Sequence, residues 1–165
     1  MSVAPGDWAC LEVTNMENAL AKPRRAKTAV QRLKDLLAEE GYRPRLESRE
    51  DGPSDLEFKV EGRRFLLRAW VSDEEFVQVC TGVLLDDGGP DEATLLRFGN
   101  ELQAHYKGVK TYLPPSRAFV EFQIELFLGG HPLSPELLER CINILKAADR
   151  DFCKRLEREM PKARA

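Results

Sequence analysis

The clearest pattern in the chain is an alternation of apolar and polar residues within the stretch from Phe119 to Leu128. The apolar members fall on one face of an extended strand: Val120, Phe122, Ile124 and Leu126. The polar members fall on the other face: Glu121, Gln123 and Glu125. A period of two predicts a strand with its apolar face on a core and its polar face in water. Such half-wet strands are typical of antiparallel sheets.

Shorter alternating runs predict further strands. Two of them flank Glu61-Gly62, a pair that fits a short hairpin turn. The apolar residues are Leu56, Phe58 and Val60 before the turn, and Phe65, Leu67, Ala69 and Val71 after it. A third run contains Phe76, Val77, Val79, Val83 and Leu85, and another begins with Val109, Thr111 and Leu113. Tyr42 to Glu47 is predicted as an edge strand, where Pro44 is tolerated.

Apolar residues spaced by three and four predict three helices. The first opens at Lys22-Pro23-Arg24-Arg25, ends at Gly41, and has the stripe Ala29, Val30, Leu33, Leu36 and Leu37. The second follows a loop at 86–90, closes at Gly108, and has the stripe Leu95, Phe98, Leu102 and Tyr106. The third begins at Ser134-Pro135, a capping serine followed by proline. It runs to about Met160, with the stripe Leu138, Cys141, Leu145, Ala148, Phe152 and Leu156.

The order of elements is helix, several strands, helix, two strands, helix. Strands and helices do not alternate one by one, which excludes a doubly wound parallel sheet. We therefore expect an α+β fold in which an antiparallel sheet has three main helices packed on it. Residues 23–160 form this domain, preceded by an arm or extra element at 1–22 and followed by a tail at 161–165.

Composition narrows the class of protein. The chain has 165 residues, a hydrophobic fraction of 42%, a charged fraction of 32% and a formal net charge of −3. These values predict one soluble domain and are not those of a strongly basic nucleic-acid binder. The N-terminus lacks the basic and apolar regions of a signal peptide, and no apolar run approaches the roughly 20 residues of a membrane helix. Cys10, Cys80, Cys141 and Cys153 form no Cys-x-x-Cys pair, so we expect reduced thiols and a cytoplasmic location.

No catalytic, cofactor-binding or metal-binding residues are predicted. The two histidines, His105 and His131, have no second His or Cys at ligand spacing. A Cys–His nucleophile pair could form only through the fold, and buried structural thiols are the favoured interpretation. A small Cys/His or metal-dependent enzyme stays an open alternative.

Three charged clusters have both a functional and a plainer interpretation. Asp86, Asp87, Asp91 and Glu92 could bind a divalent cation, but a solvated turn and the acidic start of a helix are favoured. The basic residues form two clusters: Lys22, Arg24, Arg25 and Lys27, and then Arg63, Arg64 and Arg68. Together they could track a phosphate backbone as a nucleic-acid-associated accessory protein would. Solvated surfaces are favoured here as well, because no aromatic stacking motif accompanies the basic residues.

Three stretches resemble the bacterial YbjN family, whose fold is similar to that of type III secretion chaperones. They are the helix Leu95-Leu96-Arg97-Phe98-Gly99-Asn100-Glu101-Leu102 with the following Gly108-Val109-Lys110, the strand Phe119 to Leu128, and the Gly-Gly turn into the last helix, Gly129 to Leu138. The order of elements also matches from about residue 26 onward. The resemblance implies a homodimer without enzymatic activity and with a chaperone-like role, in a family linked to bacterial stress responses and sensory transduction.

We therefore expect this chain to bind another protein, with no membrane contact and no direct nucleic-acid contact. The wide stripe of the first helix is the expected partner site, at Val30, Leu33, Leu36 and Leu37. The plainer interpretation is that all of this stripe packs on the sheet. The second helix has apolar residues on more than one side, so a homodimer interface is expected at Leu95, Leu96, Phe98, Leu102 and Tyr106.

Overall fold

A computed structural model describes residues 27–48, 52–85 and 89–159. They form a six-stranded antiparallel sheet in the order β1-β2-β3-β4-β6-β5, with three helices. The helices are α1 (Ala29–Glu39), α2 (Glu92–His105) and α3 (Pro135–Glu159). The strands are β1 (Arg45–Ser48), β2 (Ser54–Val60), β3 (Arg63–Ala69), β4 (Phe76–Leu84), β5 (Val109–Tyr112) and β6 (Phe119–Phe127). The predicted α+β class, with an antiparallel sheet and three helices, is confirmed.

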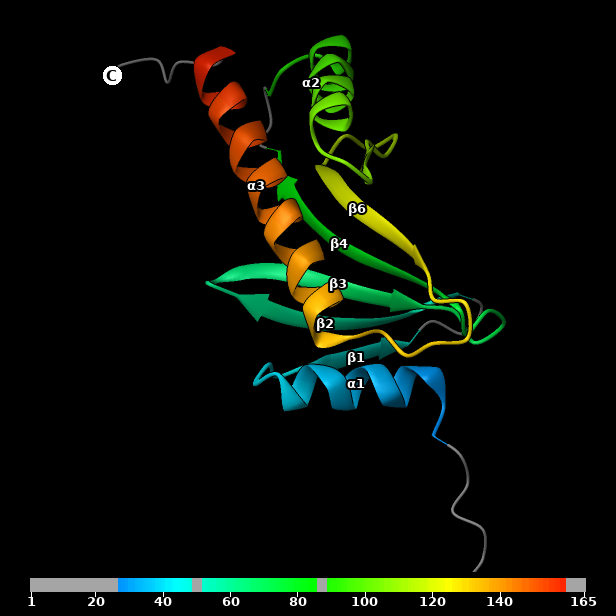
Figure 1. The fold of residues 1–165 in the computed structure, drawn as a ribbon. Helices are drawn as coiled ribbons and strands as arrows, with labels where there is room; N and C mark the ends of the chain where they lie inside the picture. The colour runs from blue at the N-terminus through cyan, green and yellow to red at the C-terminus, as the bar shows by residue number, and fades with distance from the viewer. Residues whose placement is uncertain (1–26, 49–51, 86–88, 160–165) are drawn as a thin grey trace, which may run out of the picture.

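The three helices lie on one face of the sheet. Figure 1 shows α3 running across the strands, with α1 beside β1 and β2 at one end and α2 at the other. The apolar stripe predicted for α3 is buried against the sheet at Leu138, Cys141, Leu145, Ala148 and Phe152. The Phe152 ring lies 5.2 Å from Phe122 of β6 and 6.1 Å from Phe98 of α2. Phe152 therefore connects α3 both to α2 and to the sheet.

Two local features shape the sheet. The turn between β2 and β3 places Glu61 at φ 50° and Gly62 at φ 81°, the left-handed pair that a two-residue hairpin needs. Gly82 of β4 lies so close to β6 that an added Cβ would be 2.6 Å from the carbonyl oxygen of Val120. A side chain at residue 82 would push apart the two longest strands, which pair along their whole length from Phe76–Phe127 to Leu84–Phe119.

The structure corrects three details of the predicted boundaries. The first helix begins at Ala29, because Thr28 is extended and accepts a hydrogen bond from the Gln31 N–H; residues 1–26 lie outside the described part. The second helix ends at His105, so Tyr106 follows it and Gly108 belongs to the turn. The return strand ends at Ala69, and Val71 is exposed rather than in the core.

A fourth correction concerns the polar face of β6. Val120, Phe122 and Ile124 are buried as predicted. Glu121, Gln123 and Glu125, which were expected in water, are only partly exposed.

Among the helices in the described ranges, none has the length and apolar composition that a transmembrane span requires.

Candidate protein-binding groove

The first helix is anchored to the sheet by part of its apolar stripe. Leu33 and Leu37 are buried in the core. After the helix, Gly41 takes a φ of 83° and turns the chain back, so that the Tyr42 ring lies 5.1 Å from Phe58 of β2. These contacts hold α1 along the sheet and leave its flank facing the segment after β6.

A groove of about 670 Å³ lies between that flank and the segment after β6. Its apolar wall comes from three separate parts of the chain: Leu33 and Leu36 of α1, Val77 of β4, and Leu128, Pro132 and Leu133 after β6. Clefts of this volume with apolar walls and a few polar groups are the usual form of a binding site. We refer to it below as the α1 groove.

Charged side chains line the rim of the α1 groove. Arg32 Nη2 lies 2.9 Å from Glu74 Oε2, which joins α1 to the turn between β3 and β4. Lys27 pairs with Asp35 at 2.5 Å. The hydrogen bond from Lys27, followed by that from Gln31, lowers the pKa of the Asp35 carboxyl. Glu39, Glu75 and His131 complete the rim.

The four predicted partner residues of α1 have different surroundings. Leu33 and Leu37 belong to the core of the chain itself. Val30 and Leu36 are half-buried and pack against the edge of that core, and Leu36 lines the groove. A partner in the groove would therefore contact Leu36 and the edge of Leu33, whereas Val30 does not line the groove. Whether a partner binds there stays a prediction.

The five residues predicted at a dimer interface also separate into two groups. Leu95, Phe98 and Leu102 are buried between α2 and the rest of the domain. Leu96 is 53% exposed, and Tyr106 is half-buried, with its hydroxyl donating to Asp151 Oδ2 at 2.6 Å. A homodimer contact on α2 would therefore have Leu96 at its centre, and it too stays a prediction.

The histidines and thiols are not brought together within the described residues. His131 lines the α1 groove, whereas His105 packs edge-on against Tyr106. Burial raises the pKa of the thiols of Cys80, Cys141 and Cys153, which disfavours the reactive thiolate.

In the same described part, no group of three or more His, Cys, Asp or Glu could hold a metal ion. Cys10, Asp86 and Asp87 lie outside it. Asp91 caps α2 by accepting from the Thr94 N–H at 2.7 Å, and Glu92 follows it in the first turn.

The second arginine cluster is taken up by ion pairs. Arg63 pairs with the buried Asp149 of α3, and Arg64 pairs with Glu57 at 2.7 Å. Arg68 lies 2.9 Å from Asp55 and 3.3 Å from Glu121. These pairs tie the guanidinium groups to carboxylates of the fold. In the first cluster, Lys22, Arg24 and Arg25 lie outside the described residues.

The sequence predicts one side of the groove and not the other. The sequence pattern places Val77 in a strand, and Leu128, Pro132 and Leu133 at the end of a strand and in the turn that follows. Their gathering opposite Leu36 depends on the return of the chain after β6, where the Leu128 N–H donates to the Glu75 carbonyl at 2.8 Å. No periodicity in the sequence indicates such a contact between distant segments.

Comparisons with solved structures support the fold. An uncharacterized protein from Methanothermobacter thermautotrophicus is similar with a TM-score of 0.61 and 14% identity, over 79% of this chain and 98% of that chain. A chain of the ExsC–ExsE type III secretion chaperone complex is similar with a TM-score of 0.54 and 16% identity, over 76% of this chain and 90% of that chain. YbjN from E. coli, described as a candidate transcription regulator, is similar with a TM-score of 0.53 and 8% identity, over 74% of this chain and 87% of that chain.

The expected likeness to YbjN and to secretion chaperones is therefore confirmed for the fold. No family model matches the chain, and no curated protein matches its sequence.

Proposed function

We propose that this chain is a non-enzymatic, chaperone-like module that holds a segment of a partner protein in the α1 groove. The observation that carries the proposal is the groove itself, which has apolar walls and a charged rim. The fold shared with a structure of a secretion chaperone in complex agrees with this role, although a fold does not transfer function by itself.

The physical basis is burial of apolar surface. A segment laid beside Leu36 would gain about 25 cal/mol for each Å² of apolar surface removed from water. The cost of ordering the segment reduces that gain. Because the apolar wall supplies the attraction, binding should persist at moderate salt concentration.

The proposal includes a homodimer and a cytoplasmic location. Leu96 is a large apolar side chain exposed on a helix whose opposite face already packs in the core, and a helix that packs only on its own domain needs one apolar side. Light scattering should give twice the 18.7 kDa of the chain, and Leu96→Glu should shift the mass toward that of one chain. A mass of one chain at every concentration would exclude the dimer. The link to a bacterial stress response stays a prediction.

The α1 groove is tested by a Leu36→Glu variant in a pull-down from native extract, with folding checked by circular dichroism, because Leu36 is half-buried and lines the groove. We expect this variant to lose partners that the wild type captures. Leu137→Glu is the matched control, because Leu137 is a partly exposed leucine on α3 that does not line the groove, and glutamate suits the first turn of a helix. Equal capture by Leu36→Glu and wild type would contradict this use of the groove.

A further inference from the structure

Three aromatic side chains form a connected cluster on the other side of the sheet. The Trp70 ring lies 5.0 Å from Phe76, and the Phe76 ring lies 5.0 Å from Phe127. Phe76 and Phe127 are direct cross-strand neighbours on β4 and β6. Phe127 is 80% exposed, and we call these three residues the aromatic cluster.

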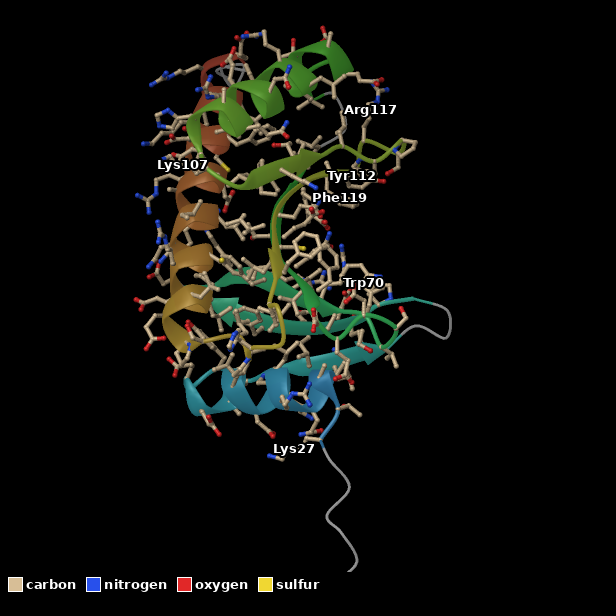
Figure 2. The ribbon with its side chains drawn as sticks, turned by 45° about the vertical axis from the view of Figure 1, so that its right-hand side comes forward. Lys27, Trp70, Lys107, Tyr112, Arg117 and Phe119 are labelled. Carbon is tan, nitrogen blue, oxygen red and sulfur yellow. The ribbon has the colours of Figure 1, made fainter. Side chains whose placement is uncertain are left out.

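The cluster points away from the helices because of strand alternation. Ala69, Val77 and Leu126, each next to one of its members, belong to or pack against the core. Figure 2 shows Trp70 on the side of the sheet away from α3. Aromatic side chains are among the strongest anchors of protein interfaces, and exposed apolar groups gathered in one place often mark such surfaces.

Carboxylates outnumber cations around the aromatic cluster. Asp73 and Glu75 lie in the turn between Trp70 and Phe76 and have no ion-pair partner among the described residues. One row further along the strands, Asp55 pairs with Arg68 and Glu125 pairs with Lys110, so that Asp73 and Glu75 are the carboxylates in excess. The surroundings of the aromatic rings therefore favour a cationic ligand.

The aromatic cluster is continuous with the α1 groove. Val77 and Leu128 line the groove, and they directly follow Phe76 and Phe127, which face the opposite side. Glu74 and Glu75 of the intervening turn also line the groove. A bound segment that leaves the groove across this turn arrives at the aromatic rings.

We propose that the aromatic cluster binds an extended segment of the partner in which arginine or lysine alternates with apolar residues. This inference rests on the proposed function and specifies the partner's chemistry. Apolar side chains of the segment cover Phe127 and Phe76, while its cations meet the Trp70 ring and the carboxylates of Asp73 and Glu75.

The test follows Trp70 emission in a Trp8→Phe background, since Trp8 and Trp70 are the two tryptophans of the chain. The probes are ten-residue peptides that alternate leucine with arginine, with serine or with glutamate. We expect the arginine peptide to change the emission and to bind at least about tenfold more tightly than the glutamate peptide. Phe127→Ser should weaken its binding about tenfold, as truncation of an aromatic anchor does.

Leu84→Ser is the matched control. Leu84 is 83% exposed and lies at the other end of β4, so this variant should bind the arginine peptide like the wild type. Asp73→Asn, in the same turn but outside the groove lining, should weaken binding several-fold and reduce its dependence on salt. Equal binding of all three peptides, or binding unaffected by Phe127→Ser, would overturn the inference.

Other occupants give different results. Emission that depends on protein concentration without peptide indicates a second copy on the cluster and overturns the assignment. A large rise in peptide affinity on removal of residues 1–21 would indicate that this segment of the chain itself occupies the cluster, and it would also overturn the assignment. If partners captured from extract are lost with Leu36→Glu and retained with Phe127→Ser, the groove functions and the aromatic cluster does not. Capture unaffected by either change would instead contradict the proposed function.

Discussion

The two faces of the sheet are built from the same strands but become buried in different ways. On the covered face, α3 buries Phe122 and its neighbours against apolar partners. On the uncovered face, Arg68 and Glu121 are 18% and 13% exposed without a helix described above them. Their own long side chains, with Asp55 and Gln78, close over the strands. Cys80 lies beneath them and is fully buried.

This difference shows that the polar face of an amphipathic strand is not always exposed to solvent. Long charged side chains can cover the backbone and apolar stems when neighbouring strands supply partners of opposite charge. Within the described residues, no buried side-chain nitrogen or oxygen lacks a hydrogen-bond partner. The uncovered face is therefore held by a satisfied polar network, and the apolar residues that stay exposed on it gather at its ends.

The largest expected effect contrasts adjacent residues of β6. Phe122→Ala removes a buried ring from the covered face and should lower the free energy of unfolding by about 3–5 kcal/mol. Gln123→Ala, on the uncovered face, should change it by roughly 0.5 kcal/mol or less. Urea denaturation measures both. Equal losses would mean that the two faces contribute alike to stability.

A smaller effect is expected on the uncovered face. Arg68→Met removes the cation shared by Asp55 and Glu121 and should cost about 1.5–3 kcal/mol, because two poorly exposed carboxylates lose a charged hydrogen-bond partner. Arg64→Met is the control on the same strand and face. Arg64 pairs with Glu57, but the Arg64 side chain is 61% exposed. The loss in free energy of unfolding should therefore be at most about 1 kcal/mol. If Arg68→Met is no worse than Arg64→Met in urea denaturation, the polar network does not hold this face.

The smallest effect tests a polar contact at the rim of the covered side. Tyr106→Phe removes the hydrogen bond to Asp151 and should cost about 1 kcal/mol at pH 8. Burial, with the hydrogen bond to Asp151, raises the pKa of Tyr106 to about 12, above the value near 10 expected in the unfolded chain.

The pH dependence of that contact follows from linkage. The contribution of Tyr106 is complete below pH 10 and is lost as the pH rises through 12. The stability difference between wild type and Tyr106→Phe should therefore shrink between these values, as measured by urea denaturation at a series of pH values. A difference that stays constant across this range would show that the hydroxyl proton is not held by the fold. Tyr112→Phe, exposed on β5, should change stability by roughly 0.5 kcal/mol or less at pH 8.

The sequence predicts only part of the candidate site. The stripe of α1 was visible because helical spacing is a local property, and Leu36 was among the predicted partner residues. The stripe could not indicate which members pack inward, because Leu33 and Leu36 have the same apolar character. The aromatic cluster is not apparent from the sequence either: Phe76 belongs to the same apolar run as Val77, yet Val77 faces inward and Phe76 faces outward.

The sequence by itself determined the class of fold, the order of its elements and the inward face of β6 and α3, since periods of two and of three to four residues arise from backbone geometry within each segment. Tertiary structure decided which apolar residues stay exposed, which carboxylates meet which arginines, and that Val77 and Leu128 come to line one groove with Leu36. These outcomes depend on contacts between residues far apart in the chain, such as Arg68 with Glu121 and Arg63 with Asp149. Local periodicity has no information about the partner that a side chain finds across the fold.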